Sequence, residues 1–420
     1  MEPRITDHWA SVTVAELRAL AEAYGTPFFL YDADVVNSRI NAVRRSLQDL
    51  VKVFYAVKAN PNLELLRALR GVADGLDISS GGELEQAALA GFDVAKVSFA
   101  GPGKTSAELA ASIERGVGFI SVESLRELTE CAELSKRLGI RANVVIRVNP
   151  LLPNRSFGIK MGGRPVQFGI DEENMSGVLE TILANRESLS FQGLHIYVGS
   201  QCFEAAGIVE GVENTFRIAR EIETKTGVPC TTINLGGGFG VSHDERGREL
   251  DLNELATKLV PILHAFNNSV KVKRQIVFEL GRFLTADAGM YVTRVTGSKE
   301  SRGKQFFIVD GGLHHHLAAA GMFGTAIRGN YPLRNLSRPD APKLRCNVAG
   351  PSCNPSDLLG VDVDLPRPEN GDLIAVLKSG SYGFTASPLL FLGHATPAEL
   401  VRHHGKVILG RRPRAIADFN

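Results

Sequence analysis

The 420-residue sequence lacks the features typical of secreted, membrane-spanning and nucleic-acid-binding proteins. Its five cysteines are scattered without a C-x-x-C pair, which favours a reduced, cytoplasmic protein. No apolar run reaches the roughly 18 residues expected of a transmembrane helix, and the first residues do not have the layout of a signal peptide. Lysine plus arginine (47) and aspartate plus glutamate (46) nearly cancel. This balance gives no support for a nucleic-acid or membrane partner.

Short β-rich runs alternate with helical patterns between about residues 50 and 280. Several runs are almost continuous in Val, Ile, Phe and Leu, as in strands that are buried on both faces. Ser80, Thr105 and Ser124 each stand three residues before a glutamate, a spacing that predicts helix starts. Eight strands separated by helices predict a (β/α)8 TIM barrel, with an open Rossmann-like sheet as the alternative. The predicted strands are 51–57, 74–79, 96–101, 118–123, 142–148, 191–198, 231–236 and 275–280.

The pattern changes beyond residue 285, where Gly-, Pro- and Asn-bearing turns separate strand-like runs without a long amphipathic helix. These runs predict an all-β C-terminal domain, which the early run 26–32 is expected to join. The length also suits two cores, since single cores stop growing near about 250–300 residues. We therefore expect a barrel at 33–285 and a β-domain formed by 1–32 plus 286–420. The C-terminal runs are 291–297, 305–312, 345–351, 372–380 and 405–410.

A lysine, Lys58, closes the first predicted strand of the barrel. Active sites of such barrels lie at the C-terminal ends of the strands. Burial there lowers the pKa of an amine and frees it for imine chemistry. A lysine that extends to solvent from a strand end is the competing interpretation.

Two further motifs follow the seventh and eighth predicted strands. The glycine-rich run 235–240 allows backbone N–H groups to converge on an anion. Glu279 could hold a pyridine nitrogen protonated, while Gly281 and Arg282 add phosphate donors. A surface Glu–Arg pair is the alternative for the last motif taken alone. Together, an amine, an anion cradle and a carboxylate fit one ligand that carries aldehyde, phosphate and pyridine groups.

With these motifs the sequence resembles the diaminopimelate/ornithine decarboxylase family of barrel-type (fold type III) pyridoxal-phosphate enzymes. The resemblance implies an amino-acid decarboxylase that uses pyridoxal 5'-phosphate. It also implies a homodimer with shared active sites, in which the β-domain completes the site and the dimer interface. The matching segments, in order, are GTPFFLYD, FYAVKAN, DISSGGELEQAALAG, RVNP, QFGID, LHIYVGSQ, NLGGGFG, ELGR, VDGG, AGPSCNPSD and SGSYGF.

The resemblance also implies roles for individual residues. Lys58 is then bonded to the cofactor aldehyde, and Glu279 pairs with the ring nitrogen. Cys353 enters the site from the partner subunit and returns a proton to the substrate. The other implied cofactor-binding residues are Asp77, Ser200, Gly237, Gly238, Gly281, Arg282 and Tyr382.

Two positions depart from the family pattern. Tyr197 stands where the family has a histidine stacked on the cofactor, and we expect its ring to replace that histidine. His195 shares a strand face with it, one layer deeper; we include it in the cofactor site, with a buried, hydrogen-bonded histidine as the default interpretation. Asn354 stands where the family has an acid that binds a distal amino group. This disfavours free lysine, ornithine and diaminopimelate as substrates.

The segments 101–104 (GPGK), 159–163 (IKMGG) and 314–316 (HHH) resemble one branch of the family. That branch contains the butirosin-pathway decarboxylase, which acts on glutamate attached to an acyl-carrier protein. The resemblance implies a carrier-bound amino acid as substrate, with free diaminopimelate as the alternative. Arg328, Tyr331 and Asn354 are the predicted substrate contacts, although a surface arginine is nearly as good an interpretation of Arg328. We predict no metal site, because consecutive histidines on a strand point to opposite sides.

Other functions fit the motifs less well. An amino-acid racemase of related fold typically places arginine at the pyridine nitrogen, whereas Glu279 keeps the ring a strong electron sink. A non-enzymatic carrier of the cofactor would need neither a second domain nor a donor cysteine. A catalytically dead relative would be expected to lose Lys58 or the phosphate ligands.

Overall fold

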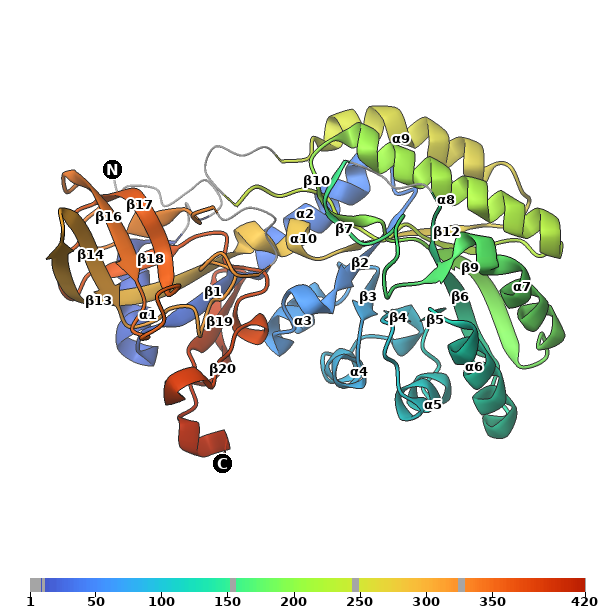
Figure 1. Cartoon of the computed structure of the whole chain (residues 1–420), viewed down its shortest axis with the longest axis horizontal. Helices are drawn as coiled ribbons and strands as arrows, with labels where there is room; N and C mark the ends of the chain where they lie inside the picture. The colour runs from blue at the N-terminus through green and yellow to red at the C-terminus, as the bar shows by residue number, and fades with distance from the viewer. Residues whose placement is uncertain (1–8, 10–11, 152–155, 244–248, 324–328, 420) are drawn as a thin grey trace.

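The structure is a computed structural model that describes residues 9, 12–151, 156–243, 249–323 and 329–419. Figure 1 shows a barrel surrounded by helices beside a second part that is built mainly of strands. In the described ranges, no helix combines the length and apolar character needed to cross a membrane.

Eight parallel strands form the barrel. They are hydrogen-bonded in the order β5-β4-β3-β2-β12-β11-β9-β6, and pairing of β5 with β6 closes the ring. Closure confirms the barrel and excludes an open Rossmann-like sheet. The strands are β2 (Lys52–Ala56), β3 (Gly75–Ile78), β4 (Val97–Phe99), β5 (Phe119–Val122), β6 (Ala142–Asn149), β9 (Leu189–His195), β11 (Thr232–Asn234) and β12 (Gln275–Leu280).

Amphipathic helices cover the outside of the barrel and bury apolar side chains against its strands. Ser80, Thr105 and Ser124 cap helices as predicted. Of these three, Thr105 alone forms the reciprocal capping box, because Glu83 accepts from Ser79 N–H and Glu127 accepts from Glu123 N–H. The helices are α2 (Ala33–Ser46), α3 (Leu63–Leu69), α4 (Gly81–Leu89), α5 (Ser106–Glu114), α6 (Leu125–Leu138), α7 (Met175–Ala184), α8 (Ala205–Thr226), α9 (Leu252–Asn267) and α10 (Arg282–Thr285). Short strands β7 (Phe157–Lys160), β8 (Ile170–Asp171) and β10 (Gly199–Cys202) lie near the strand ends.

The second part is a mixed sheet. As expected from the sequence, β1 (Phe28–Asp32) joins it, antiparallel to β13 and parallel to β19. Helix α1 (Val14–Tyr24), which the sequence analysis did not anticipate, packs on this sheet through Leu17. The sheet therefore has a helical cover that an all-β domain would lack. Its other strands are β13 (Gly289–Ser301), β14 (Lys304–Val309), β15 (Leu333–Asn335), β16 (Lys343–Ala349), β17 (Leu358–Pro366), β18 (Leu373–Val376), β19 (Ala398–His403) and β20 (Lys406–Arg411).

Two local expectations were wrong. The predicted strand 191–198 ends at His195, so Tyr197 follows β9 and the argument from a shared strand face does not apply to it. His314, His315 and His316 lie in turns and not on a strand, so alternation of side chains says nothing about metal binding there.

Candidate active site

A pocket opens where the C-terminal ends of β2, β11 and β12 meet. Lys58 follows β2 in a short 3-10 turn (Val57–Ala59), and Tyr382 reaches the pocket from the segment after β18. Motifs that are hundreds of residues apart in the sequence therefore form one wall. The lining residues are Ala56, Lys58, Tyr197, Ser200, Gly237, Gly238, Phe239, Glu279, Leu280, Gly281, Arg282, Phe283 and Tyr382.

The other predicted site residues lie behind this wall or away from it. Asp77 contacts Lys58, and His195 faces Glu279. Tyr331 is buried and stacks on His243, which contacts Arg282. Cys353 is exposed and Asn354 is half-buried, and neither lines the pocket within the described chain. Arg328 lies outside the described residues.

Lys58 forms an ion pair with Asp77, with 3.4 Å between Nζ and Oδ2. Its side chain is 45% exposed, whereas that of Asp77 is only 1% exposed. Burial lowers the pKa of Lys58, but the negative charges around it, Asp77 first, outweigh burial and leave that pKa raised. The expectation of a lowered pKa was therefore wrong, because a buried carboxylate stabilises the ammonium form.

Glu279 is held by donors that the sequence analysis missed. Asn234 Nδ2 donates to Oε1, and Ser98 Oγ donates to the same oxygen at 3.1 Å. Burial, with help from the charge of Asp77, raises the pKa of Glu279 to about 8. The only signals in the sequence were a serine inside the apolar strand β4 and an asparagine just before the glycine run.

The glycines after β11 are required by close backbone contacts. A Cβ atom at Gly237 would lie 2.0 Å from Glu279 O, and one at Gly238 would lie 2.1 Å from Gly199 O. Gly238 also has a φ of 95°, which side chains rarely adopt. The bare backbone at these positions forms part of the pocket wall. Arg282 lies over the Tyr382 ring, with 4.5 Å from Cζ to the ring centroid, and supplies positive charge on the same side.

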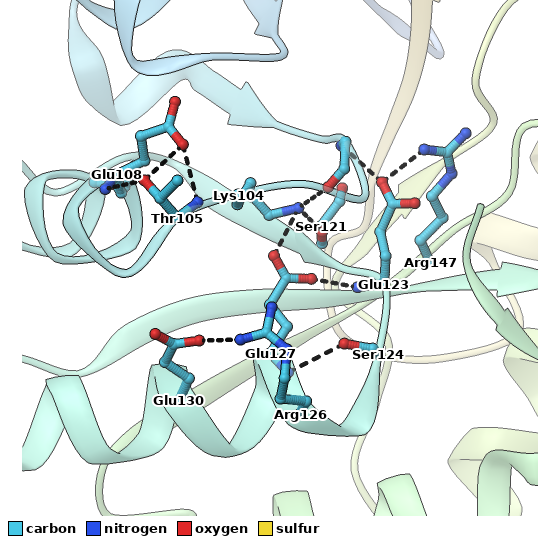
Figure 2. A network of polar contacts seen from close by, with 12 residues as sticks. Lys104, Thr105, Glu108, Ser121, Glu123, Ser124, Arg126, Glu127, Glu130 and Arg147 are labelled. Atoms are coloured by element: carbon cyan, nitrogen blue, oxygen red, sulfur yellow. Dashed lines mark hydrogen bonds and ion pairs between the residues drawn. The ribbon is translucent and has the colours of Figure 1, made fainter. Parts of the chain in front are cut away.

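Two buried ion pairs join the loop after β4 to α6 and the end of β5 to β6 (Figure 2). Lys104 Nζ lies 2.9 Å from Glu127 Oε1, and Arg147 Nη1 lies 2.7 Å from Glu123 Oε1. Gly101 N–H also donates to Glu123, at 2.6 Å. The GPGK segment 101–104 thus has a structural explanation in this network.

The three consecutive histidines, His314, His315 and His316, are buried. His315 Nδ1 lies 3.1 Å from Tyr291 Oη, and its Nε2 lies 2.9 Å from Ala395 O. Burial lowers the pKa of His314 to about 4 and those of His315 and His316 to about 3. All three rings are therefore neutral near pH 7.

Comparison with known proteins identifies the family. Residues 33–286, more than half of the chain, match the model described as pyridoxal-dependent decarboxylase, pyridoxal binding domain. The chain belongs to the pyridoxal-dependent decarboxylases. It is thus an enzyme that decarboxylates an amino acid with pyridoxal phosphate, as the resemblance implied.

Relatives of this decarboxylase differ in substrate. It is 37% identical over 412 residues to the L-glutamyl-[BtrI acyl-carrier protein] decarboxylase of Niallia circulans, covering 96% of this chain and 95% of that protein. It is 31% identical over 397 residues to the diaminopimelate decarboxylase of Aquifex aeolicus, covering 94% and 91%. The Helicobacter pylori diaminopimelate decarboxylase complexed with L-lysine has a TM-score of 0.84 at 28% identity, covering 96% and 98%.

The pocket of the decarboxylase fits pyridoxal phosphate. It offers an amine at Lys58, a carboxyl group at Glu279, and a glycine cradle with Arg282 for an anion. The ring nitrogen, aldehyde and phosphate of the cofactor each find a complementary group.

Proposed function

We propose that Lys58 bonds the aldehyde of pyridoxal phosphate and that Glu279 pairs with its ring nitrogen. Tyr197 then supplies an aromatic face beside the ring, while Asp77 and His195 support the site from behind. The support for this assignment is that one pocket gathers the amine, the carboxyl group and the glycine cradle. The proposed phosphate ligands are Ser200, Gly237, Gly238, Gly281, Arg282 and Tyr382.

Pyridoxal phosphate, when bound, accepts the electron pair that is left on the substrate Cα as the carboxylate departs. The protein's own groups do the rest. Lys58 yields its position to the substrate amine and later takes it back. Glu279 keeps a proton on the ring nitrogen, and Cys353 returns a proton to the substrate Cα.

Lys58→Ala tests the first assignment. The change should remove both turnover and the visible absorbance of the lysine-bound cofactor, because the pocket-lining residues include no other lysine. Borohydride reduction of the wild-type enzyme should fix the cofactor to the peptide that contains Lys58. A labelled peptide from elsewhere in the chain would refute the assignment.

We further propose that the substrate is an amino acid joined through its side-chain acyl group to a carrier protein. Two observations support it: the 37% identity to the Niallia circulans enzyme, and the uncharged Asn354, whose Oδ1 accepts from Ser356 N–H at 2.9 Å. A substrate that is tethered through its side-chain acyl group has no distal ammonium. The neutral amide of Asn354 can therefore contact that side chain without leaving a buried charge unpaired. Free diaminopimelate remains the second candidate, supported by the structural match to the lysine complex.

The substrate proposal is tested by measuring kcat/KM for a carrier-bound glutamyl thioester and for free diaminopimelate, lysine and ornithine under one set of conditions. We expect the carrier-bound substrate to be strongly preferred. Asn354→Asp should shift the preference towards diamines, whereas Asn268→Asp at the exposed end of α9 should not. Efficient turnover of diaminopimelate with none of the thioester would replace this proposal with the second candidate.

We also propose a cytoplasmic, biosynthetic homodimer in which Cys353 of each subunit completes the site of the other. The exposed position of Cys353, away from the pocket of its own chain, supports this arrangement. The proposed division is a cofactor-binding barrel at 33–285 and a second domain of 1–32 plus 286–420.

A further inference from the structure

His195, the last residue of β9, lies between two polar groups inside the barrel. Its Nδ1 lies 3.1 Å from Ser121 Oγ, and its Nε2 lies 3.5 Å from Glu279 Oε2. The side chain is 2% exposed. Burial, together with the positive charge of Arg147, holds the pKa of His195 well below its usual range. The ring is therefore neutral and carries a single proton.

The neighbours decide which nitrogen carries that proton. In the loaded enzyme the charge of a protonated ring nitrogen favours the ionised form of Glu279, against the effect of burial. Beside that carboxylate a bare Nε2 would place two lone pairs against each other, so Nε2 carries the hydrogen on the side of the ring that faces Oε2. Nδ1 is then the acceptor, and the Ser121 hydroxyl donates to it. Nε2 has no hydrogen bond of normal length within the described chain. Such contacts commonly shorten when an active site is loaded.

The serine is itself held in place by a buried ion pair. Lys104 Nζ donates to Ser121 O at 2.9 Å while it pairs with Glu127 (Figure 2). Lys104 also donates to Gly101 O, at 2.6 Å. The end of β5 is thus fixed to α6 and to the GPGK loop, and Ser121 Oγ keeps its place beside the imidazole.

We propose that His195 is a positioning residue that acts on the cofactor through Glu279. The ionised Glu279 favours the tautomer with hydrogen on Nε2, and Ser121 supports that tautomer by donating to Nδ1. The Nε2–H then orients Oε2 of Glu279 while Asn234 and Ser98 hold Oε1. The ring nitrogen of the cofactor then meets an ionised carboxylate in one fixed orientation. This inference rests on the proposed role of Glu279.

The test compares His195→Phe, His195→Gln and Ser121→Ala with wild type, and uses Ser112→Ala as the control. Ser112 is buried in the same barrel, but its hydroxyl donates to Glu108 O in α5. We expect His195→Phe to lower kcat about tenfold to a hundredfold, the equivalent of one hydrogen bond to a charged group, with little change in KM. His195→Gln, which keeps a donor near the Nε2 position, should recover part of that loss. Ser121→Ala should lower kcat, and Ser112→Ala should not.

A double variant separates this chain of contacts from two unrelated structural effects. Once the ring is gone, loss of the Ser121 hydroxyl should cost nothing more, so Ser121→Ala/His195→Phe should have the kcat of His195→Phe. Imidazole ¹⁵N NMR of the loaded enzyme, with the His195 signal assigned from its loss in His195→Gln, should show a protonated Nε2 and a bare Nδ1. Additive losses in kcat, or a proton on Nδ1, would overturn the proposal.

Glu279→Gln is measured alongside, so that a failure of the inference about His195 can be distinguished from a failure of the proposed role of Glu279. If Glu279→Gln is slow but His195→Phe turns over like wild type, the inference about His195 is wrong and the role of Glu279 stands. If Glu279→Gln also turns over like wild type, the proposed role of Glu279 is wrong, and the inference falls with it.

Discussion

Glu279 is the residue on which the proposed chemistry depends most. Three side chains, Asn234, Ser98 and His195, surround its carboxyl group. Glu279→Gln keeps the shape but removes the charge, so cofactor binding should persist while kcat falls by about 10²–10³, the usual loss when an electrostatic contact to the reacting system is removed. Absorbance of bound cofactor and kcat measure the two effects separately. A variant that loses the cofactor altogether would show that Glu279 serves binding instead.

The raised pKa of Glu279 has a consequence for stability in the cofactor-free protein. Its pKa is about 8 in the folded chain, against an ordinary value of 4.5. Between these values the folded state binds more protons than the unfolded state, so the free energy of unfolding falls as pH rises from about 5 to about 8. Because Glu279→Gln lacks this group, the Tm of wild type minus that of the variant should decrease over this range. A difference that stays constant with pH would contradict the raised pKa.

At the scale of single elements, the sequence predicted the barrel strands better than those of the second sheet. The barrel strands are apolar runs buried on both faces, and each was predicted to within a few residues. Strands β15, β17 and β19 were missed. β15 is only three residues long, while charged residues interrupt the apolar pattern of the other two: Asp362 and Asp364 in β17, and the buried Glu399 in β19.

The buried pair between Lys104 and Glu127 joins the loop after β4 to helix α6. Lys104→Met would leave Glu127 buried without its partner, which should destabilise the fold by about 3–5 kcal/mol. Lys136→Met is the matched control, since Lys136 is exposed on α6 and its ammonium group donates to Asn185 Oδ1. Denaturant unfolding of both variants measures the difference. Equal stability of Lys104→Met and wild type would show that Glu127 readily takes up a proton in its place.

At the scale of the whole molecule, the candidate site was predictable where it depends on motifs and unpredictable where it depends on topology. Lys58, the glycine run and Glu279 stand at strand ends, which the closed barrel brings together. Ser98 and Ser121 lie in no motif, and Asn234 begins the matching segment NLGGGFG without a role assigned to it. They reach the site because the closed barrel brings side chains of β4, β5 and β11 next to Glu279 and His195.

Cys353 raises the question of whether one chain contains a complete site. It is exposed and separate from the pocket that holds Lys58 within the described chain. If the partner subunit supplies it, Lys58→Ala and Cys353→Ala proteins, each inactive alone, should regain activity when their subunits exchange. A mixed dimer then has one site with both wild-type residues, so a random mixture should recover up to about a quarter of wild-type activity, because half of the dimers are mixed and each has one working site of two.

The measurement needs proof of subunit exchange, which mass spectrometry of differently tagged chains provides. Each variant mixed with itself is the control, because it undergoes the same exchange without creating a complete site. Recovery that follows the fraction of mixed dimers would show that the site is shared between subunits. No recovery in a mixture that contains mixed dimers would mean that each chain builds its own site. The loop that carries Cys353 would then have to move towards the pocket of its own barrel during turnover.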